Sequence, residues 1–361
     1  MSFDSYNLQE VGLGKAFCRL GYDFDLVYYS KENRNQDISI NGCKLTILWR
    51  RGIRFLRTGV FPFVLKKDFL ERYDAVIMSE YDQLMSYLVA KRHPNTYLYN
   101  GLYYNLFKIP FFEPLYSFLF NKRENSLLKH TFCKTKDARD FLEKRHFSNM
   151  SVVGVGLDPE KFESESAPDE NTLNLLKKME GHRNLLYVGS VSARKNVDFL
   201  IKVFNSLKEK AEFEDVQLVI VGRSEKKFWE KCRKDIESPV ENSVIYVPFI
   251  KNAQLKFIYE KSDVFVLPSK QEIFGMVLLE SMYFGKPAVA SASAGAKTLI
   301  ENGICGIIVD DFDVNLWQAS LENVLRENIS ELGKRAEIRI KNNFLWDGIA
   351  ASIISTMENV T

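Results

Sequence analysis

The stretch from Ser262 to Ser291 constrains the fold more than any other part of this chain. It reads SDVFVLPSKQEIFGMVLLESMYFGKPAVAS: an apolar run, a short polar loop, a helical pattern and a second apolar run. Gly285 followed closely by Pro287 is typical of the end of a helix. A strand, a helix and a strand in such close succession predict a parallel βαβ unit, whose ligand crevice lies outside the carboxyl ends of the strands.

Two glutamates, Glu272 and Glu280, bracket the polar loop and the start of this helix. Glu272 falls at the expected crevice. The helix is predicted to begin near Gly275, so its first amides lack intrahelical acceptors and favour a phosphate group. A carboxylate at Glu280, about one turn further along, can accept hydrogen bonds from two vicinal hydroxyls, such as those of a ribose. The alternative is an ordinary loop carboxylate and an exposed helix residue.

The surroundings of these glutamates resemble glycosyltransferase family 4, the retaining GT-B enzymes or glycosyl transferases group 1. The shared signature is Glu-x(7)-Glu after a strand that ends in Pro-Ser, with Phe274-Gly275 between the glutamates and GKPAVAS after them. The resemblance covers nearly the whole chain. It implies an α/β GT-B fold, in which two Rossmann-like domains face a cleft and a C-terminal helix crosses back to the first domain.

A second landmark is LLYVGSVSARKNVDFLI (185–201), which resembles the family's strand, glycine turn and basic clamp. The resemblance implies that Gly189 lets the backbone approach the donor pyrophosphate and that Lys195 neutralises it. Ser190 stands where many members carry an arginine, and Arg194 is expected to supply the second positive charge. The alternative is two solvated cations that open a helix.

Further stretches, VQLVIVGRSE (216–225) and VIYVPFIKNAQLKFIYEKSD (244–263), resemble the family's next turn and its base-binding segment. Phe249, Ile250 and Leu255 would pack against the base, although they are equally good core residues. The residues expected to hold the donor are therefore Gly189, Gly222, Phe249, Ile250, Leu255, Phe274, Gly275, Met276, Val277 and Glu280. Glu272, Lys195 and Arg194 are the expected catalytic groups.

The resemblance places an acceptor-binding domain at 1–155, a donor-binding domain at 156–340 and the crossing helix at 341–361. On the acceptor side, Gly12 and Gly14 are candidates for close approach to the cleft, or else glycines that pack a helix. Asn100 stands near the place where many relatives have a histidine facing the reacting sugar. An amide can bind a sugar hydroxyl but cannot act as acid or base near neutral pH.

The strand that normally opens a doubly wound domain is missing from this reading, because Met1 stands almost at the first glycine-bearing turn. We therefore predict an unfilled or substituted position in the front sheet beside the strand at 24–30. Residues 1–6 forming a full central strand would contradict this.

Charge is uneven, with 23 Lys and Arg against 16 Asp and Glu in residues 1–150. The cations are densest between Lys44 and Lys67, where aromatic residues alternate with them and no acid intervenes. This segment could contact an anionic membrane or a phosphate-bearing acceptor, or it could be a solvated basic helix with core aromatics. A second aromatic stretch, 99–120, is either core or a surface for a lipid acceptor. No nucleic-acid motif accompanies the cations.

Other features argue against metals, disulfides and membrane spans. No apolar stretch reaches the roughly 20 residues that cross a bilayer, and no secretory signal is recognised. The five cysteines are scattered and the four histidines have no metal-ligand spacing. Asp310-Asp311-Phe312-Asp313 contains Asp-x-Asp, which holds a metal in another glycosyltransferase fold, but here it matches an ordinary loop. We expect a cytoplasmic enzyme, metal-independent, without cofactor, and associated at most peripherally with the inner membrane face.

The sequence thus predicts a retaining glycosyltransferase that moves a sugar from a UDP- or GDP-sugar to a glycan or lipid-linked glycan, in surface polysaccharide biosynthesis. Nucleic acid is not an expected partner. Two alternatives stay open: a non-catalytic relative that binds nucleotide-sugars, and another GT-B reaction such as sugar-nucleotide epimerisation.

Overall fold

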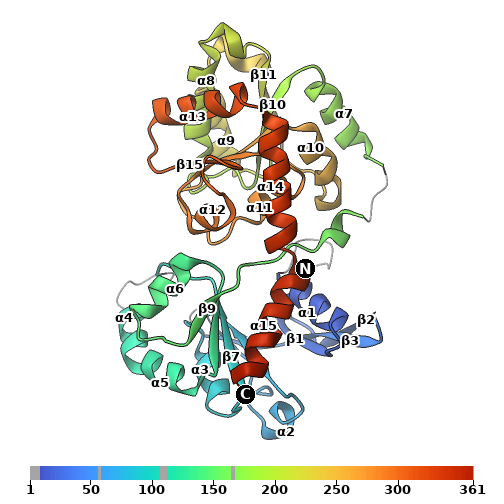
Figure 1. The fold of residues 1–361 in the computed structure, drawn as a ribbon, viewed down its shortest axis with the longest axis vertical. Helices are drawn as coiled ribbons and strands as arrows, with labels where there is room; N and C mark the ends of the chain where they lie inside the picture. Colours follow the sequence, from blue (N-terminus) through green and yellow to red (C-terminus); the bar gives the residue numbers. More distant parts are fainter. Residues whose placement is uncertain (1–8, 56–57, 106–111, 164–166, 361) are drawn as a thin grey trace. The chain divides into compact units, whose positions relative to one another are not determined.

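The computed structural model describes residues 9–55, 58–105, 112–163 and 167–360. The chain divides into two compact units. The back unit is residues 157–344, and the front unit combines the described residues before 157 with those after 344. Each unit is an α/β arrangement with helices against its sheets (Figure 1); the back sheet is parallel throughout, whereas the front unit also has the antiparallel pairs β2–β3 and β4–β5. The predicted fold class, with two Rossmann-like domains, is confirmed.

The back unit is built on six parallel strands in the order β12-β11-β10-β13-β14-β15. The strands are β10 (Arg183–Val188), β11 (Val216–Val221), β12 (Val244–Val247), β13 (Val264–Leu267), β14 (Ala288–Ser291) and β15 (Gly306–Val309). The helices are α7 (Glu170–Met179), α8 (Val197–Lys208), α9 (Lys226–Lys234), α10 (Leu255–Lys261), α11 (Met276–Tyr283), α12 (Ala294–Leu299), α13 (Val314–Arg326) and α14 (Ile329–Asn343). A 3₁₀ turn, η2 (Pro159–Phe162), precedes them.

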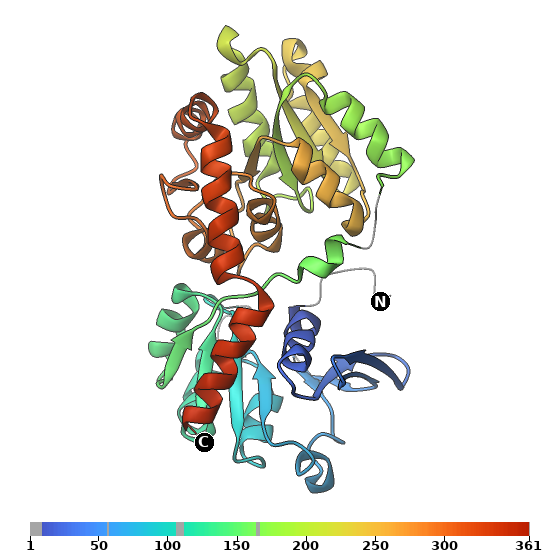
Figure 2. The ribbon, with the colours of Figure 1, turned by 45° about the vertical axis from the view of Figure 1, so that its right-hand side comes forward.

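The central strands of this sheet are mostly apolar because both of their faces are covered. Every residue of β11, β13 and β14 is buried, as expected for a parallel sheet between two helical layers. The strand order runs one way from β10 to β12 and the other way from β13 to β15. Right-handed crossovers then put α8 and α9 on one face and α10 and α11 on the other, which can be followed in Figure 2.

The front unit contains a four-stranded parallel sheet, β6-β7-β8-β9, a three-stranded sheet, β1-β3-β2, and the hairpin β4-β5. Its strands are β1 (Phe24–Tyr29), β2 (Arg34–Ile40), β3 (Cys43–Arg50), β4 (Ile53–Phe55), β5 (Thr58–Val60), β6 (Val76–Ser79), β7 (Thr96–Asn100), β8 (His130–Cys133) and β9 (Met150–Val152). The helices are α1 (Gln9–Arg19), α2 (Lys67–Leu70), α3 (Leu84–Ala90), α4 (Phe112–Tyr116), α5 (Lys122–Leu127) and α6 (Lys136–Glu143). A π-helical turn, η1 (Ser117–Asn121), joins α4 to α5.

The C-terminal helix α15 (Trp346–Val360) packs on the front unit, as predicted. The Trp346 ring covers Gly12 of α1, where a Cβ would lie 2.2 Å from the indole nitrogen. Arg19 forms an ion pair with Asp347 at 2.6 Å, and the Tyr97 hydroxyl of β7 donates to the carbonyl of Met357 at 3.4 Å. Contacts along its length therefore attach α15 to this unit.

β1 and β6 are among the edge strands of the front unit that lack a second partner strand among the described residues. β1 pairs with β3 alone and β6 pairs with β7 alone, while Val27 of β1 and Val76 of β6 pack in the same apolar cluster. The predicted open position beside the strand at 24–30 stays a prediction. Residues 1–6, where that prediction could fail, lie outside the described residues.

The basic segment 44–67 is not a helix but strands β3, β4 and β5 with the turns that follow them. Its aromatic residues belong to the core: Trp49 is 4% exposed, and Phe61 and Phe63 pack against a buried cluster. Two of its cations have local partners: Lys44 pairs with Asp37 at 2.9 Å, and Arg50 donates to backbone and side-chain oxygens of β2. The structure therefore supports the core alternative. Within the described ranges, no helix is both long and apolar enough to cross a membrane.

Candidate active site

The order of the back sheet reverses between β10 and β13, and a doubly wound sheet binds ligands at such a point. The loops that follow these two strands, 189–196 and 268–275, meet there. The Lys270 amide donates to the carbonyl of Arg194 at 3.0 Å, and the Arg194 guanidinium donates to the carbonyl of Gln271 at 2.9 Å. Two predicted site loops that are far apart in the sequence are thus joined by hydrogen bonds.

An ion pair between Lys195 and Glu272 lies at the centre of this junction. The Lys195 ammonium donates to a carboxylate oxygen of Glu272, and the two side chains are 11% and 17% exposed. Asn196, in the left-handed conformation with φ 59°, turns the chain into α8 directly after the lysine. Asparagine tolerates that conformation better than most residues. The two predicted catalytic groups are brought together, whereas Arg194 remains exposed beside them.

Helix α11 begins at Met276, as predicted, after Gly275 with φ 83°. Its first amides are therefore at the same junction as Glu272. Further along α11, Glu280 is buried at 7% exposure rather than exposed. Its carboxylate accepts from the Tyr259 hydroxyl at 2.9 Å and from the Lys161 ammonium at 2.5 Å. Neither partner was predicted, because both are distant in the sequence.

The two predicted glycines, Gly189 and Gly222, pack against each other at the carboxyl ends of β10 and β11. Both have φ near 150°, and a Cβ on Gly222 would lie 1.8 Å from the carbonyl oxygen of Gly189. The absence of a side chain is required here by backbone packing, whatever ligand approaches. This explains Gly222 without a substrate, whereas a Cβ on Gly189 would lie 3.0 Å from the Tyr187 hydroxyl.

The residues predicted to bind a base separate into two groups. Ile250 and Leu255 are buried at 6% exposure each, so they belong to the core, as does Phe274 of the wider predicted donor site, at 2%. Phe249 is 53% exposed, and the Arg223 guanidinium lies 4.9 Å from its ring centroid. Of the three, Phe249 alone therefore has an exposed ring, and this ring follows the carboxyl end of β12.

In the front unit, Asn100 is fully buried and uses its amide for structure. Its oxygen accepts from the Tyr81 amide at 3.3 Å and its nitrogen donates to the Leu102 carbonyl at 3.0 Å. Gly14 packs on Leu45, where a Cβ would lie 2.7 Å from the leucine side chain. With Gly12 beneath Trp346, both glycines therefore have the helix-packing explanation that the sequence left open.

A polar pair that the sequence did not reveal, Glu80 and Lys134, lies at the carboxyl edge of the four-stranded sheet. The Glu80 carboxylate accepts from the amides of Gly101 and Leu102 at 3.0 and 3.2 Å, and from Lys134 at 3.3 Å. Glu80 has φ 66°, a strained conformation for this residue type. Strain of this kind often accompanies function. The sequence signal was only that both residues follow strands.

Among the described residues, no group of three or more His, Cys, Asp or Glu is arranged to hold a metal ion. Asp313 caps α13 by accepting from the Leu316 amide at 3.0 Å, and Asp311 accepts from the next amide at 2.7 Å. The Asp-x-Asp sequence therefore serves the start of a helix.

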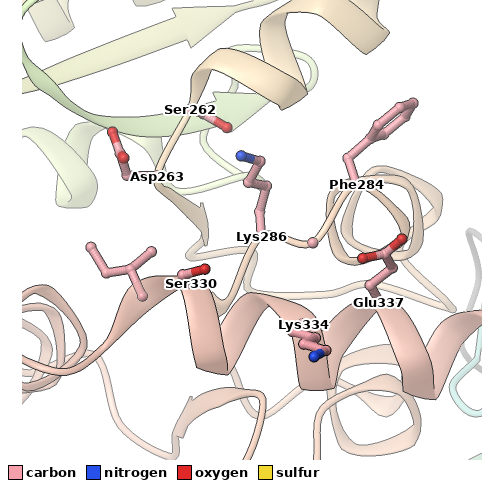
Figure 3. A pocket seen from close by; sticks show the side chains of 9 residues that line it. Ser262, Asp263, Phe284, Lys286, Ser330, Lys334 and Glu337 are labelled. Carbon is pink, nitrogen blue, oxygen red and sulfur yellow. The ribbon is translucent and has the colours of Figure 1, made fainter.

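A cavity of about 660 Å³ lies elsewhere in the back unit (Figure 3). It is lined by Asp263, Lys286, Lys334 and Glu337, among others. Asp263 directly precedes β13 and Lys286 nearly precedes β14, so the cavity is at the amino edge of the sheet. Burial lowers the pKa of Lys286, whose ammonium donates to the Glu260 carbonyl at 2.9 Å. None of the predicted donor residues lines this cavity.

The chain is similar to known proteins both in sequence and in fold. A D-inositol 3-phosphate glycosyltransferase from Xylanimonas cellulosilytica is 26% identical over 226 residues, which cover 59% of this chain and 52% of that protein. The chain thus matches about half the length of this curated relative. A UDP-forming trehalose-phosphate synthase from Burkholderia xenovorans is similar in structure, with a TM-score of 0.71, 14% identity, and coverage of 99% of this chain and 98% of that one.

A second solved structure, HepE from Anabaena in complex with UDP and glucose, has a TM-score of 0.62 and 16% identity, and covers 82% of each chain. These structures, with the two Rossmann-like units, define the fold as GT-B. Residues 170–343 match the family described as glycosyl transferases group 1.

Proposed function

We propose that this protein is a retaining glycosyltransferase of the family 4 type. It transfers a sugar from a UDP- or GDP-sugar to a hydroxyl of a glycan or lipid-linked glycan, in surface polysaccharide biosynthesis. The observation that carries the proposal is the Lys195–Glu272 pair at the start of α11, where the back sheet reverses its order. Support also comes from the group 1 match over residues 170–343 and from the bound UDP and glucose of HepE.

In the proposed reaction, the bond between the anomeric carbon and the diphosphate breaks, and a bond from that carbon to the acceptor oxygen forms on the same face. The acceptor proton passes to the leaving phosphate. Negative charge grows on that phosphate, and Lys195, Arg194 and the first amides of α11 stabilise it. With cations already present at the phosphates, we propose that no metal is required.

A bound donor would replace contacts that the site residues make with one another. The diphosphate takes the place of the Glu272 carboxylate beside Lys195, which leaves Glu272 to accept from the sugar hydroxyls. Glu280 has two carboxylate oxygens with about four acceptor positions, and Tyr259 and Lys161 occupy one on each oxygen. The remaining positions suit the two ribose hydroxyls. Phe249, with Arg223 on its ring, would stack on the base.

We assign the acceptor to the front unit, and Glu80 and Lys134 are its strongest candidates. A carboxylate held by two backbone amides is a fixed acceptor for a sugar hydroxyl. Asn100 cannot act as an acid or base, as the histidine of many relatives could, since an amide does not titrate near neutral pH. Proton transfer to the leaving phosphate makes such a group unnecessary.

The test is calorimetry and thermal unfolding with UDP, GDP, ADP and their sugar conjugates, followed by a transfer assay with radiolabelled donor. Saturation at a hundredfold excess over Kd should stabilise the native state by about 2.7 kcal/mol. Folded protein that binds none of these nucleotides would contradict the donor site. Nucleotide binding without transfer would favour the non-catalytic relative, and interconversion of donor sugars without an acceptor would favour epimerisation.

We further propose that the protein works in the cytoplasm, peripherally bound to the inner face of an anionic membrane, where a lipid-linked acceptor would lie. This placement is motivated by the exposed apolar and basic residues of the front unit.

A further inference from the structure

The helical segment 112–127 of the front unit exposes large apolar side chains. Phe118 is 84% exposed, and Leu115 and Leu119 are 38% and 44% exposed. They lie on α4 and the π-helical turn η1 at spacings of three and four residues, so they share one side of the segment. The sequence left this stripe open between core and lipid surface. In the sequence, the stripe consists of Phe107, Phe111, Leu115 and Phe118 within the aromatic stretch 99–120. Leu115 and Phe118 are not core, and Phe107 and Phe111 lie outside the described residues.

The same segment has its cations exposed and its acids buried. Lys122 and Arg123 at the start of α5 are exposed, while both acids, Glu113 and Glu124, are buried. Glu113 pairs with Arg145 at 2.6 Å. The outward side of residues 112–127 therefore carries apolar groups and cations and no carboxylate. The wider π-helical turn shifts the following residues around the axis, which leaves Asn121 and Glu124 inside and the two cations outside.

We propose that this face, made of Leu115, Phe118, Leu119, Lys122 and Arg123, docks on an anionic lipid bilayer. Apolar side chains would enter the boundary between headgroups and acyl chains, and the cations would contact lipid phosphates, as in other interfacial helices. Charge complementarity selects this occupant over a protein surface, because the face has two cations and no acid. The inference rests on the proposed function and deepens it by locating the membrane contact. It moves that contact away from segment 44–67, whose Trp49 is buried and whose Phe61 and Phe63 pack against a buried cluster.

The test is cosedimentation with vesicles of phosphatidylcholine alone or mixed with phosphatidylglycerol. We expect binding to the anionic vesicles only, weakened at least about tenfold by Lys122→Glu with Arg123→Glu and also weakened by Phe118→Ser. Lys177→Glu with Lys178→Glu, an exposed adjacent pair on α7, makes the same change in charge elsewhere and should retain binding. Leu316→Ser, which changes a 53% exposed leucine of α13, is the apolar control.

Equal loss in the α7 variant, no binding by the unchanged protein, or equal binding to neutral vesicles would each overturn the proposal. A protein that sediments as a dimer and becomes monomeric only in Phe118→Ser, without any effect on vesicles, would show instead that this face contacts a second copy. UDP and GDP binding is measured on the same preparations. Failure of vesicle binding with intact nucleotide binding would contradict only the membrane contact of this face. Failure of nucleotide binding with intact vesicle binding would contradict only the donor site.

Discussion

Lys195 and Glu272 are 77 positions apart in sequence, yet their charged groups form an ion pair where the loops after β10 and β13 meet. In the proposed donor complex each of them has a different partner. We therefore expect Glu272→Gln to bind free UDP or GDP at least as tightly as the unchanged protein, because the competing carboxylate charge is gone. Transfer should fall by two or more orders of magnitude. Calorimetry and a transfer assay separate the two effects, and weaker nucleotide binding in this variant would contradict the competition.

Lys195→Met is the complementary change. It should weaken binding of the nucleoside diphosphate by roughly ten- to hundredfold, since hydrogen bonds to charged groups contribute about 1.5–3 kcal/mol. Binding of the nucleoside, which lacks phosphates, should be unchanged. Lys270→Met, a lysine of the same junction that is exposed, is the matched control. An equal loss of nucleoside affinity would mean that the substitution disturbs the fold of the loop.

Glu280 is expected to bind the ribose, and a change in the ligand tests this directly. In the unchanged protein, removal of the 2′-hydroxyl from the nucleotide should weaken binding severalfold. In Glu280→Gln the ribo and deoxy forms should bind more equally. The same variant should lose stability by about 1–3 kcal/mol, because the buried Lys161–Glu280 contact loses its charge partner. If the preference for ribose survives in full, Glu280 has only a structural role.

Gly12 and Gly348 provide a matched pair on helices that pack together. Gly12→Ala should destabilise the front unit by about 1–3 kcal/mol, because the new methyl group meets the Trp346 ring. Gly348→Ala has open space around its Cβ and lies inside α15, so it should be neutral or stabilise by up to about 1 kcal/mol. Urea unfolding measures both. An unchanged stability in Gly12→Ala with an altered KM for acceptor would restore the acceptor-side role.

Glu124 makes stability depend on pH. Burial, and then the nearby Asp82, raise the pKa of its carboxyl well above the usual value, and neither oxygen has a hydrogen-bond partner among the described residues. At a pH above the pKa that Glu124 has in the unfolded chain, the native state holds a proton that the unfolded chain has released. The contribution of Glu124 to the free energy of unfolding therefore falls as pH rises. This single carboxyl can change the folding equilibrium by at most about tenfold per pH unit. Glu124→Gln should flatten the fall between pH 5 and 8 in urea unfolding. An unaltered pH profile would mean that the carboxyl is hydrated.

Patterns within a short stretch predicted the local structure well. The apolar runs and the glycine and proline stops of 262–291 gave β13, α11 and β14, because buried parallel strands and helix ends depend on residues close in sequence. The hairpin of β2 and β3 was missed, although Asn41-Gly42, both with positive φ, is a strong signal for its turn.

Partnerships between distant residues were not predictable. Nothing near Glu280 in the sequence indicates Lys161, and nothing near Glu80 indicates Lys134. The cations of 44–67 suggested a surface for anions because the sequence does not show that Asp37 and the oxygens of β2 lie beside them. Candidate site residues follow from local motifs, whereas their ionic partners depend on the tertiary fold.

The path of the chain has a consequence for how the protein can be divided. Residues 157–344 are inserted between two parts of the front unit, and the ends of the insertion are tied by the Leu157 amide, which donates to the carbonyl of Phe344 at 2.8 Å. Adjacent ends are the condition under which an inserted domain can be excised or transplanted. The back unit should thus be separable as one continuous piece. Shortening the chain at its carboxyl terminus instead removes α15 from the front unit.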